Sequence, residues 1–114
     1  MATRLTLRLD FDSGERIGPG KIALLETIGK TGSIAAAGRK LGMSYRRAWL
    51  LTDELNRIFG TALLETKGGG KNGGGAELTP LGKQVVTLYR SAEAKARRSA
   101  AKEIARMERS LGAS

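Results

Sequence analysis

The sequence contains no cysteine and no histidine. Without cysteine there is no disulfide framework, no thiolate zinc site and no thiol nucleophile. Without histidine there is no Ser-His catalytic pair, no imidazole metal ligand and no side chain that ordinarily titrates near neutral pH. No nucleophile–base pair is visible among the remaining residues. We therefore expect a protein that is not an enzyme and that uses no metal or cofactor.

Long apolar runs are also missing. No stretch approaches the roughly 20 apolar residues of a membrane span, and residues 1–11 alternate instead of forming the apolar core of a signal peptide. The pattern indicates a cytoplasmic protein. At 114 residues with 40% hydrophobic side chains, the chain is long enough for one domain with a modest core.

Acidic residues are few relative to basic ones. The chain has 20 lysines and arginines against 11 aspartates and glutamates, a formal charge of +9. Such an excess favours a polyanionic partner, either nucleic acid or an anionic membrane surface. A basic solvated face with no such partner is the plainer alternative, since net charge identifies a partner only loosely.

The N-terminal third predicts two short strands and a helix. Leu5, Leu7, Leu9 and Phe11 alternate with polar residues, which indicates a strand with one apolar face. A turn then leads to a brief second strand at Arg16 and Ile17. Pro19 suits the first turn of a helix, where its missing N–H is no loss. The apolar stripe of this helix is Ile22, Leu24, Leu25 and Ile28, and residues 29–32 end it.

The next segment predicts a helix-turn-helix. Ser33 is a good N-cap for a helix over 34–41, Gly42 suits its tight end, and Ser44 caps a third helix from Tyr45 to about Phe59. The small residues of the helix over 34–41, which is rich in alanine at 35–37, permit a close crossing of the two helices. Leu41, Met43 and Ala48 are expected inside the crossing. The buried face of the third helix is expected to hold Ala48, Leu51, Thr52, Leu55 and Phe59.

This pair of helices predicts a nucleic-acid site. The first turn of the second helix would enter the major groove, where arginine can bind guanine or a phosphate through two hydrogen bonds. An ordinary helical hairpin with solvated arginines is the alternative. Trp49 is expected mainly to pack, and otherwise to lie on the DNA surface. The predicted DNA-binding residues here are Ser33, Ser44, Tyr45, Arg46 and Arg47.

A glycine-rich segment over 67–75 follows, between short strands expected at 63–66 and 76–78. It holds six of the chain's 16 glycines. Such a segment is typical of the wing of a winged helix, where Lys67, Lys71 and Asn72 would contact DNA and glycines permit close approach. A phosphate-binding nucleotide loop is disfavoured, because no Gly-Lys-Ser/Thr ending leads into a helix. A flexible linker is the other alternative.

The last helix begins at Thr79 and Pro80, an N-cap followed by proline at the first helical position. Nothing breaks it before Gly112, so we expect about thirty residues of continuous helix. Its thin apolar seam exceeds what a domain of this size can cover, which predicts a homodimer. The residues predicted at the dimer interface are Val85, Leu88, Ala92, Ala96, Ile104 and Met107.

Residues 18–88 resemble the N-terminal domain of ModE-type molybdate-responsive regulators. The resemblance lies in Thr31–Ile34, in Gly42–Trp49 and in the glycine-rich segment that runs into Thr79. Within the second stretch, Arg46 and Trp49 match the family's basic residue and the tryptophan three positions later. The frame from Ser33 to Gly82 also resembles the broader LysR-type domain. The resemblance implies transcription control by a homodimer that reads a two-fold operator in double-stranded DNA.

The family's oxyanion-binding domains have no counterpart in this sequence. A small-barrel ligand domain cannot be built from the single helical segment after Thr79, so a molybdate response is not carried over. We expect a mainly α fold with a small β wing: a winged helix-turn-helix over 1–82 and a dimerisation helix over 79–114. A non-specific nucleoid or RNA-binding protein, and a winged-helix module for protein contacts, are the alternative functions.

Overall fold

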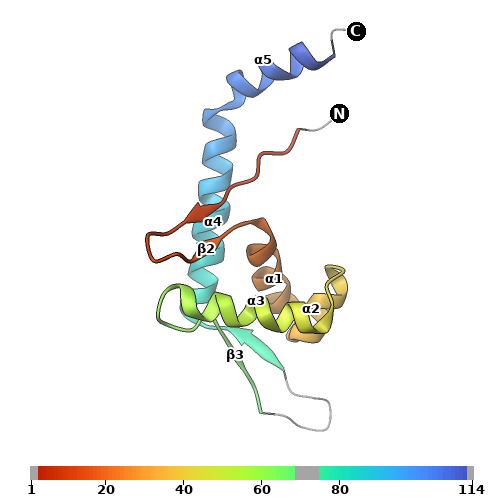
Figure 1. Cartoon of the computed structure of the whole chain (residues 1–114), viewed down its shortest axis with the longest axis vertical. Helices are drawn as coiled ribbons and strands as arrows, with labels where there is room; N and C mark the ends of the chain where they lie inside the picture. Colours follow the sequence, from red (N-terminus) through yellow and green to blue (C-terminus); the bar gives the residue numbers. More distant parts are fainter. Residues whose placement is uncertain (1–2, 69–74, 113–114) are drawn as a thin grey trace.

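The computed structural model describes residues 3–68 and 75–112 and shows a winged helix-turn-helix with a helical stalk (Figure 1). The predicted fold class is confirmed. Three helices form the core, and α3 lies across the base of α4, which extends away from it (Figure 1). The helices are α1 (Pro19–Thr31), α2 (Ile34–Lys40), α3 (Tyr45–Ile58), α4 (Pro80–Ser99) and α5 (Ala101–Leu111). The strands are β1 (Leu9–Asp10), β2 (Arg16–Ile17), β3 (Leu64–Thr66) and β4 (Ala76–Leu78).

The core is built around α1, which contacts α2, α3, α4 and β4. The four side chains of its predicted stripe, Ile22, Leu24, Leu25 and Ile28, are fully buried. Gly29 lies against Leu78 of β4, where a Cβ atom would stand 3.2 Å from the leucine side chain. Burial of this helix on several sides explains why its apolar residues extend around more than one face.

The helix boundaries follow the predicted caps closely. Pro19 is the first residue of α1, and the Ser33 hydroxyl accepts a hydrogen bond from the Ala36 N–H at 3.1 Å. Thr79 caps α4 in the same way through the Gly82 N–H at 3.0 Å. The predicted end of α2 at Leu41 is one residue too long, because Leu41 is the C-cap and has left helical geometry.

The N-terminal strand is much shorter than predicted. Only Leu9 and Asp10 pair, with Ile17 and Arg16, although the alternation covers residues 5–11. Within residues 3–68 and 75–112 the rest of the segment pairs with no strand, and it runs obliquely toward α4 and crosses it (Figure 1). Tyr89, which is 4% exposed, donates a hydrogen bond from its hydroxyl to the Leu7 carbonyl and holds the segment there. Leu7 and Phe11 pack against the core, whereas Leu9 is 42% exposed, so the alternation predicted core contacts only in part and did not predict a strand ladder.

Phe59 lies outside the buried face of α3, where it was predicted. It is 42% exposed and occupies the C-cap position, at which the helix has already ended. Its ring packs edge-to-face against Phe11, with ring centroids 5.8 Å apart. The buried face therefore consists of Ala48, Leu51, Thr52 and Leu55.

The predicted thirty-residue helix is two helices. Helix α4 ends at Ser99, Ala100 leaves helical geometry, and α5 continues in a different direction (Figure 1). At 100° per residue, the stripe of Val85, Leu88, Ala92 and Ala96 and the stripe within residues 104–111 are centred about 90° apart on a straight helix. A bend between the stripes changes where the second one faces. No proline or glycine lies near Ala100, so the sequence contains no helix-breaking residue that predicts the bend.

Helix α4 is attached to the core through the segment that precedes β3. The Thr79 N–H donates to the Leu63 carbonyl at 3.0 Å, and the Thr79 hydroxyl donates to the Ala62 carbonyl at 2.8 Å. Gly82 then faces the Leu63 backbone so closely that a Cβ atom would stand 2.0 Å from the carbonyl oxygen. Only glycine fits this contact.

An ion-pair network joins α4 to α1 farther along. Arg90 donates from Nε and Nη2 to both carboxylate oxygens of Glu26, at 2.9 and 2.6 Å, and from Nη1 to Glu93 at 2.9 Å. Hydrogen bonds from Arg90 lower the pKa of Glu26 below its ordinary value of 4.5, and the same contact raises the pKa of Arg90. The two-oxygen geometry makes this the most specific ion pair between the helices of the described chain.

Replacement of Gly82 by alanine should destabilise the fold by about 3 kcal/mol or more, at the upper end of what overpacking costs. The added methyl group meets rigid backbone, so relief requires α4 to move from Leu63. Gly20→Ala is the matched control, because a Cβ atom at Gly20 meets nothing within 4 Å. Chemical denaturation measures both variants. Equal stability of the two would show that the α4 attachment tolerates a side chain.

Glu26→Gln should lower thermal stability at neutral pH and flatten its dependence on acid pH. Because the folded-state pKa of Glu26 is depressed, its stabilisation is present above the unfolded value and is lost as pH falls through the folded value. Thermal unfolding from pH 7 down to about pH 3 tests this. The exposed Glu103, changed to glutamine, serves as control. A parallel pH profile for Glu26→Gln and the native chain would contradict the assignment.

Candidate nucleic-acid interface

The turn between α2 and α3 has the geometry of a helix-turn-helix. Gly42 adopts the left-handed conformation with φ 72°, and the Met43 N–H donates to the Gly38 carbonyl at 2.8 Å. The Ser44 hydroxyl then caps α3 by accepting from the Arg47 N–H at 3.1 Å. A glycine is needed at position 42, because a left-handed φ strains other residues.

The two helices cross with almost no space between them. Gly38 lies over Ala48, where a Cβ atom on the glycine would stand 3.1 Å from the alanine Cβ. The sequence assigned the close crossing to the small residues of this helix without singling out Gly38, although a glycine inside a short helix is the signal that identifies it. Of the residues expected inside the crossing, Ala48 is fully buried and Met43 half-buried. Leu41 is 37% exposed, because it follows the last turn of α2.

The first turn of α3 is fully presented to solvent. Ser44, Tyr45, Arg46 and Arg47 are all exposed, as the sequence predicted for a binding helix. Across residues 3–68 and 75–112, neither arginine has a carboxylate oxygen within 4.0 Å. Two guanidinium groups in the same turn are thus available to an external anion or base edge.

Ser33 lies at the other end of α2 and is half-buried. Its hydroxyl caps the helix, as described above. Its carbonyl accepts a hydrogen bond from the Thr31 hydroxyl at 3.1 Å. The side chain therefore has a structural role, and a contact with nucleic acid at Ser33 stays a prediction.

Two further side chains complete the exposed surface of α3. Leu50 is 54% exposed and shares a helical face with Arg46, one turn earlier. Trp49 is 39% exposed and packs edge-to-face against Tyr45 with ring centroids 6.1 Å apart. Trp49 also lines a groove between α3 and β3, so it packs at the edge of the surface instead of in the core. Sequence reasoning did not select Leu50, although its position four residues after Arg46 placed it there.

The β3–β4 hairpin lies beside α3 as the predicted wing (Figure 1). Its register pairs Leu64 with Leu78 and Thr66 with Ala76, and the Lys67 N–H extends the ladder to the Gly75 carbonyl at 2.7 Å. The Lys67 ammonium lies 3.2 Å from the Glu77 carboxylate, so its charge is paired. Lys71 and Asn72, predicted to contact DNA, lie outside the described residues.

Asn56 fixes the hairpin to α3. Its side-chain oxygen accepts from the Leu63 and Leu64 N–H groups at 2.8 and 3.1 Å, and its amide nitrogen donates to the Leu64 carbonyl at 3.1 Å. The Ala76 N–H also donates to the Gly32 carbonyl at 2.8 Å, which ties β4 to the end of α1. The wing and α3 therefore form one unit.

The residues predicted for dimerisation separate into two groups. Val85 is 9% exposed and belongs to the chain's own core, so it does not lie on a free seam. Leu88 and Met107 are 59% and 62% exposed, Ala92 is exposed, and Ala96 and Ile104 are half-buried. The radius of gyration, 16.9 Å, exceeds the roughly 13 Å of a compact chain of this length, which reflects the uncovered stalk.

Two features are absent from residues 3–68 and 75–112. No helix there is long and apolar enough to cross a membrane. No group of three or more histidine, cysteine, aspartate or glutamate side chains in these segments is arranged to hold a metal ion.

The helix-turn-helix and its wing lie in a region that matches a known protein family. Residues 20–83, which run from α1 into α4, match the family described as bacterial regulatory helix-turn-helix protein, lysR family. The matched region includes the α2–α3 unit and the wing. This agrees with the LysR-type frame that the sequence itself indicated.

Similar proteins include several whose names refer to molybdenum. The chain is 40% identical over 99 residues to the molybdenum-pterin-binding protein MopB of Rhodobacter capsulatus, covering 87% of this chain and 35% of MopB. It is 38% identical over 94 residues to the molybdenum transport protein ModE of Azotobacter vinelandii, covering 81% and 35%. It is 36% identical over 89 residues to the DNA-binding transcriptional dual regulator ModE of Escherichia coli K12, covering 78% and 34%.

The resemblance to ModE-type regulators is thereby confirmed. The chain spans about a third of the length of these relatives. Given the match over more than half of its residues, together with the α2–α3 geometry, the chain belongs to the lysR family of bacterial regulatory helix-turn-helix proteins.

Proposed function

We propose that this chain binds an operator in double-stranded DNA through the first turn of α3 and thereby regulates transcription. The observation that carries the proposal is the exposed pair Arg46 and Arg47, which have no carboxylate partner among the described residues and follow the helix-turn-helix turn. Such a turn fits the major groove, and guanine offers two acceptors to one guanidinium. The E. coli relative is named as a DNA-binding transcriptional regulator, which supports the same role.

The contacts divide by the direction of the side chains on α3. Arg46 and Leu50 point away from the buried face, so they reach base edges, with Tyr45 beside them. Ser33 and Ser44 lie at helix N-termini, where phosphate contacts are favoured. The wing residues Lys67, Lys71 and Asn72 reach the backbone or minor groove, and Lys67 exchanges Glu77 for a phosphate in doing so.

The chain acts as a homodimer joined along α4 and α5. Leu88, Ala92 and Ala96 on α4, with Ile104 and Met107 on α5, give the stalk an apolar surface, one stripe on each helix, that the core of the same chain leaves largely uncovered. A second stalk would cover it, since small residues permit close approach of two helices. Two-fold symmetry then presents two copies of α3 to an inverted repeat.

We extend neither a molybdenum response nor an enzymatic activity to this chain. The names of the R. capsulatus and A. vinelandii relatives mention molybdenum, yet the described part of this chain consists of the helix-turn-helix, its wing and the stalk. The protein acts inside the cell, where its operator is.

Arg46→Ala should weaken binding to the operator by about 1–3 kcal/mol more than binding to random duplex, because a base contact is lost. Arg57→Ala is the matched control, an exposed arginine on the same side of α3 in its last turn. Fluorescence anisotropy with an operator selected from genomic fragments measures both. Equal losses on operator and random duplex would reassign Arg46 to a phosphate contact.

Met107→Glu should weaken self-association at least about tenfold, or ~1.4 kcal/mol, because a charge enters the seam. Folding should be unaffected, since Met107 is 62% exposed. Ala101→Glu adds the same charge at an exposed position on another side of α5. Sedimentation velocity over a concentration series compares them. A monomeric native chain with full operator affinity would contradict the dimer.

A further inference from the structure

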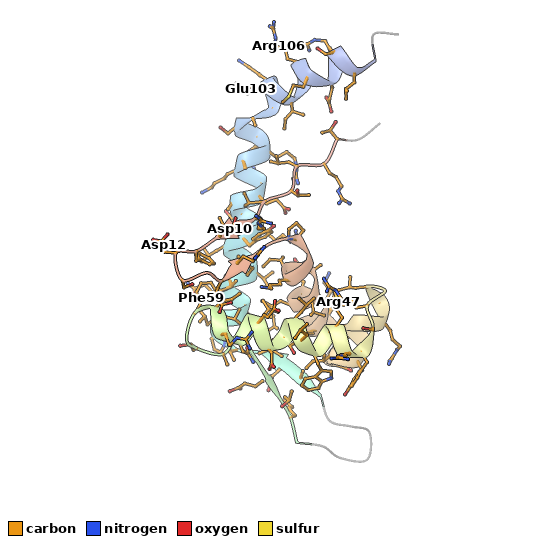
Figure 2. The ribbon with its side chains drawn as sticks, in the orientation of Figure 1. Asp10, Asp12, Arg47, Phe59, Glu103 and Arg106 are labelled. Atoms are coloured by element: carbon orange, nitrogen blue, oxygen red, sulfur yellow. The ribbon has the colours of Figure 1, made fainter. Side chains whose placement is uncertain are left out.

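The two flanks of α3 carry opposite charge. On one flank, α3, the start of α1 and the β1–β2 hairpin enclose a cleft lined by Arg8, Arg16, Lys21 and Arg47 with Glu54 as its one carboxylate; we name it the hairpin cleft. Figure 2 shows Arg47 on the side of α3 away from the β3–β4 wing. Four cations thus face one carboxylate in a single depression.

The groove on the wing side has the reverse balance. It is lined by Asp53, Glu65 and Glu77 with Lys67 as its one cation. Glu65 and Glu77 face each other across the β3–β4 ladder, and Lys67 lies 3.2 Å from Glu77. In this groove three carboxylates disfavour an anion and Lys67 favours one, so its balance of charge is less favourable to DNA than that of the hairpin cleft.

The cations of the hairpin cleft differ in their partners. The Lys21 ammonium lies 3.1 Å from Glu54 and donates to the Arg16 carbonyl at 2.9 Å, so it is occupied. Arg8 pairs with Asp10 at 3.2 Å in an exposed contact. Within the described segments, Arg16 and Arg47 have no carboxylate oxygen within 4.0 Å. Arg16 comes from β2 and Arg47 from α3, so two separate elements supply the free charges.

The backbone at the start of α1 adds to the positive electrostatic potential of the hairpin cleft. Gly18, Pro19 and Gly20 at the start of α1 line the same cleft. No side chain caps α1 at Gly18, and its first turn contains no acidic residue. Positive side chains and a positive helix end therefore act on the same depression.

We propose that the hairpin cleft binds the DNA phosphate backbone along one wall of the major groove, with Arg16 and Arg47 as the contacting residues. This inference rests on the proposed function, because it needs α3 in the groove. Both walls of the major groove carry phosphates, so a helix lying in it exposes both flanks to them. Arg47 belongs both to the first turn of α3 and to the cleft, which makes the two surfaces continuous. The β1–β2 hairpin then widens the footprint beyond the helix-turn-helix.

The salt dependence of binding tests the proposal. Arg16→Ala in the full chain should reduce the slope of log affinity against log salt by about 0.9, the value of one phosphate contact, on operator and on random duplex alike. Arg16→Lys should restore most of the slope, because it keeps the charge. Arg98→Ala, an exposed arginine on α4, is the matched control and should leave the slope unchanged. Anisotropy titrations between roughly 50 and 200 mM salt provide the slopes.

An unchanged slope for Arg16→Ala would overturn the proposal. Inorganic phosphate distinguishes a free-anion site from a DNA contact: saturable phosphate-induced NMR shifts at Arg16 with an unchanged DNA slope would also overturn it. Failure of the proposed function has a different result. In that case Arg46→Ala leaves operator binding intact, whereas failure of this inference alone leaves the Arg46 effect in place and removes only the Arg16 effect.

Discussion

The close contact between Gly38 and Ala48 governs how α3 is presented. Because a Cβ atom on Gly38 would stand 3.1 Å from the Ala48 Cβ, the spacing of the two helices has almost no slack. The left-handed Gly42 and the hydrogen bond from Met43 to Gly38 then set the direction in which α3 leaves the turn. A larger residue at position 38 would push α3 outward and displace Arg46 and Arg47 together.

Close backbone contacts also connect α3 to the wing and to α4. Asn56 joins α3 to the start of the wing through three hydrogen bonds. The backbone of Leu63 in turn receives the Thr79 N–H and lies against Gly82, so α4 is positioned by the segment that Asn56 holds. The stalk and the recognition helix are thus linked through a short chain of backbone contacts. Any partner that fixes two stalks relative to each other would also fix the spacing of two α3 helices.

Features with a local physical cause were predictable from the sequence. The caps Ser33, Ser44 and Thr79 were correctly identified, because a side-chain oxygen at an N-cap satisfies a backbone donor within three residues. The exposure of Arg46 and Arg47 followed from helical periodicity in the same way. The wing strands were predicted to within one residue, because local turn residues mark their ends. The fold class was also predicted correctly.

Features that depend on distant contacts were not predictable in this way. Alternation over residues 5–11 gave no information that Tyr89, on α4, would hold the segment without a strand partner. The bend at Ala100 was not predicted, because no helix-breaking residue lies there. The salt bridge of Lys67 with Glu77 and the assembly of the hairpin cleft bring together residues from different elements. Their spacing in the sequence contains no sign of that proximity.

In the DNA complex that we propose, α3 enters the major groove with its first turn foremost. NMR titration of the isotope-labelled chain with a selected operator duplex tests it most directly. We expect the largest amide shifts on Ser44, Tyr45, Arg46, Arg47 and Leu50, with smaller shifts on the wing and on Arg16. Shifts confined to α4 and α5, with the first turn of α3 unperturbed, would contradict it.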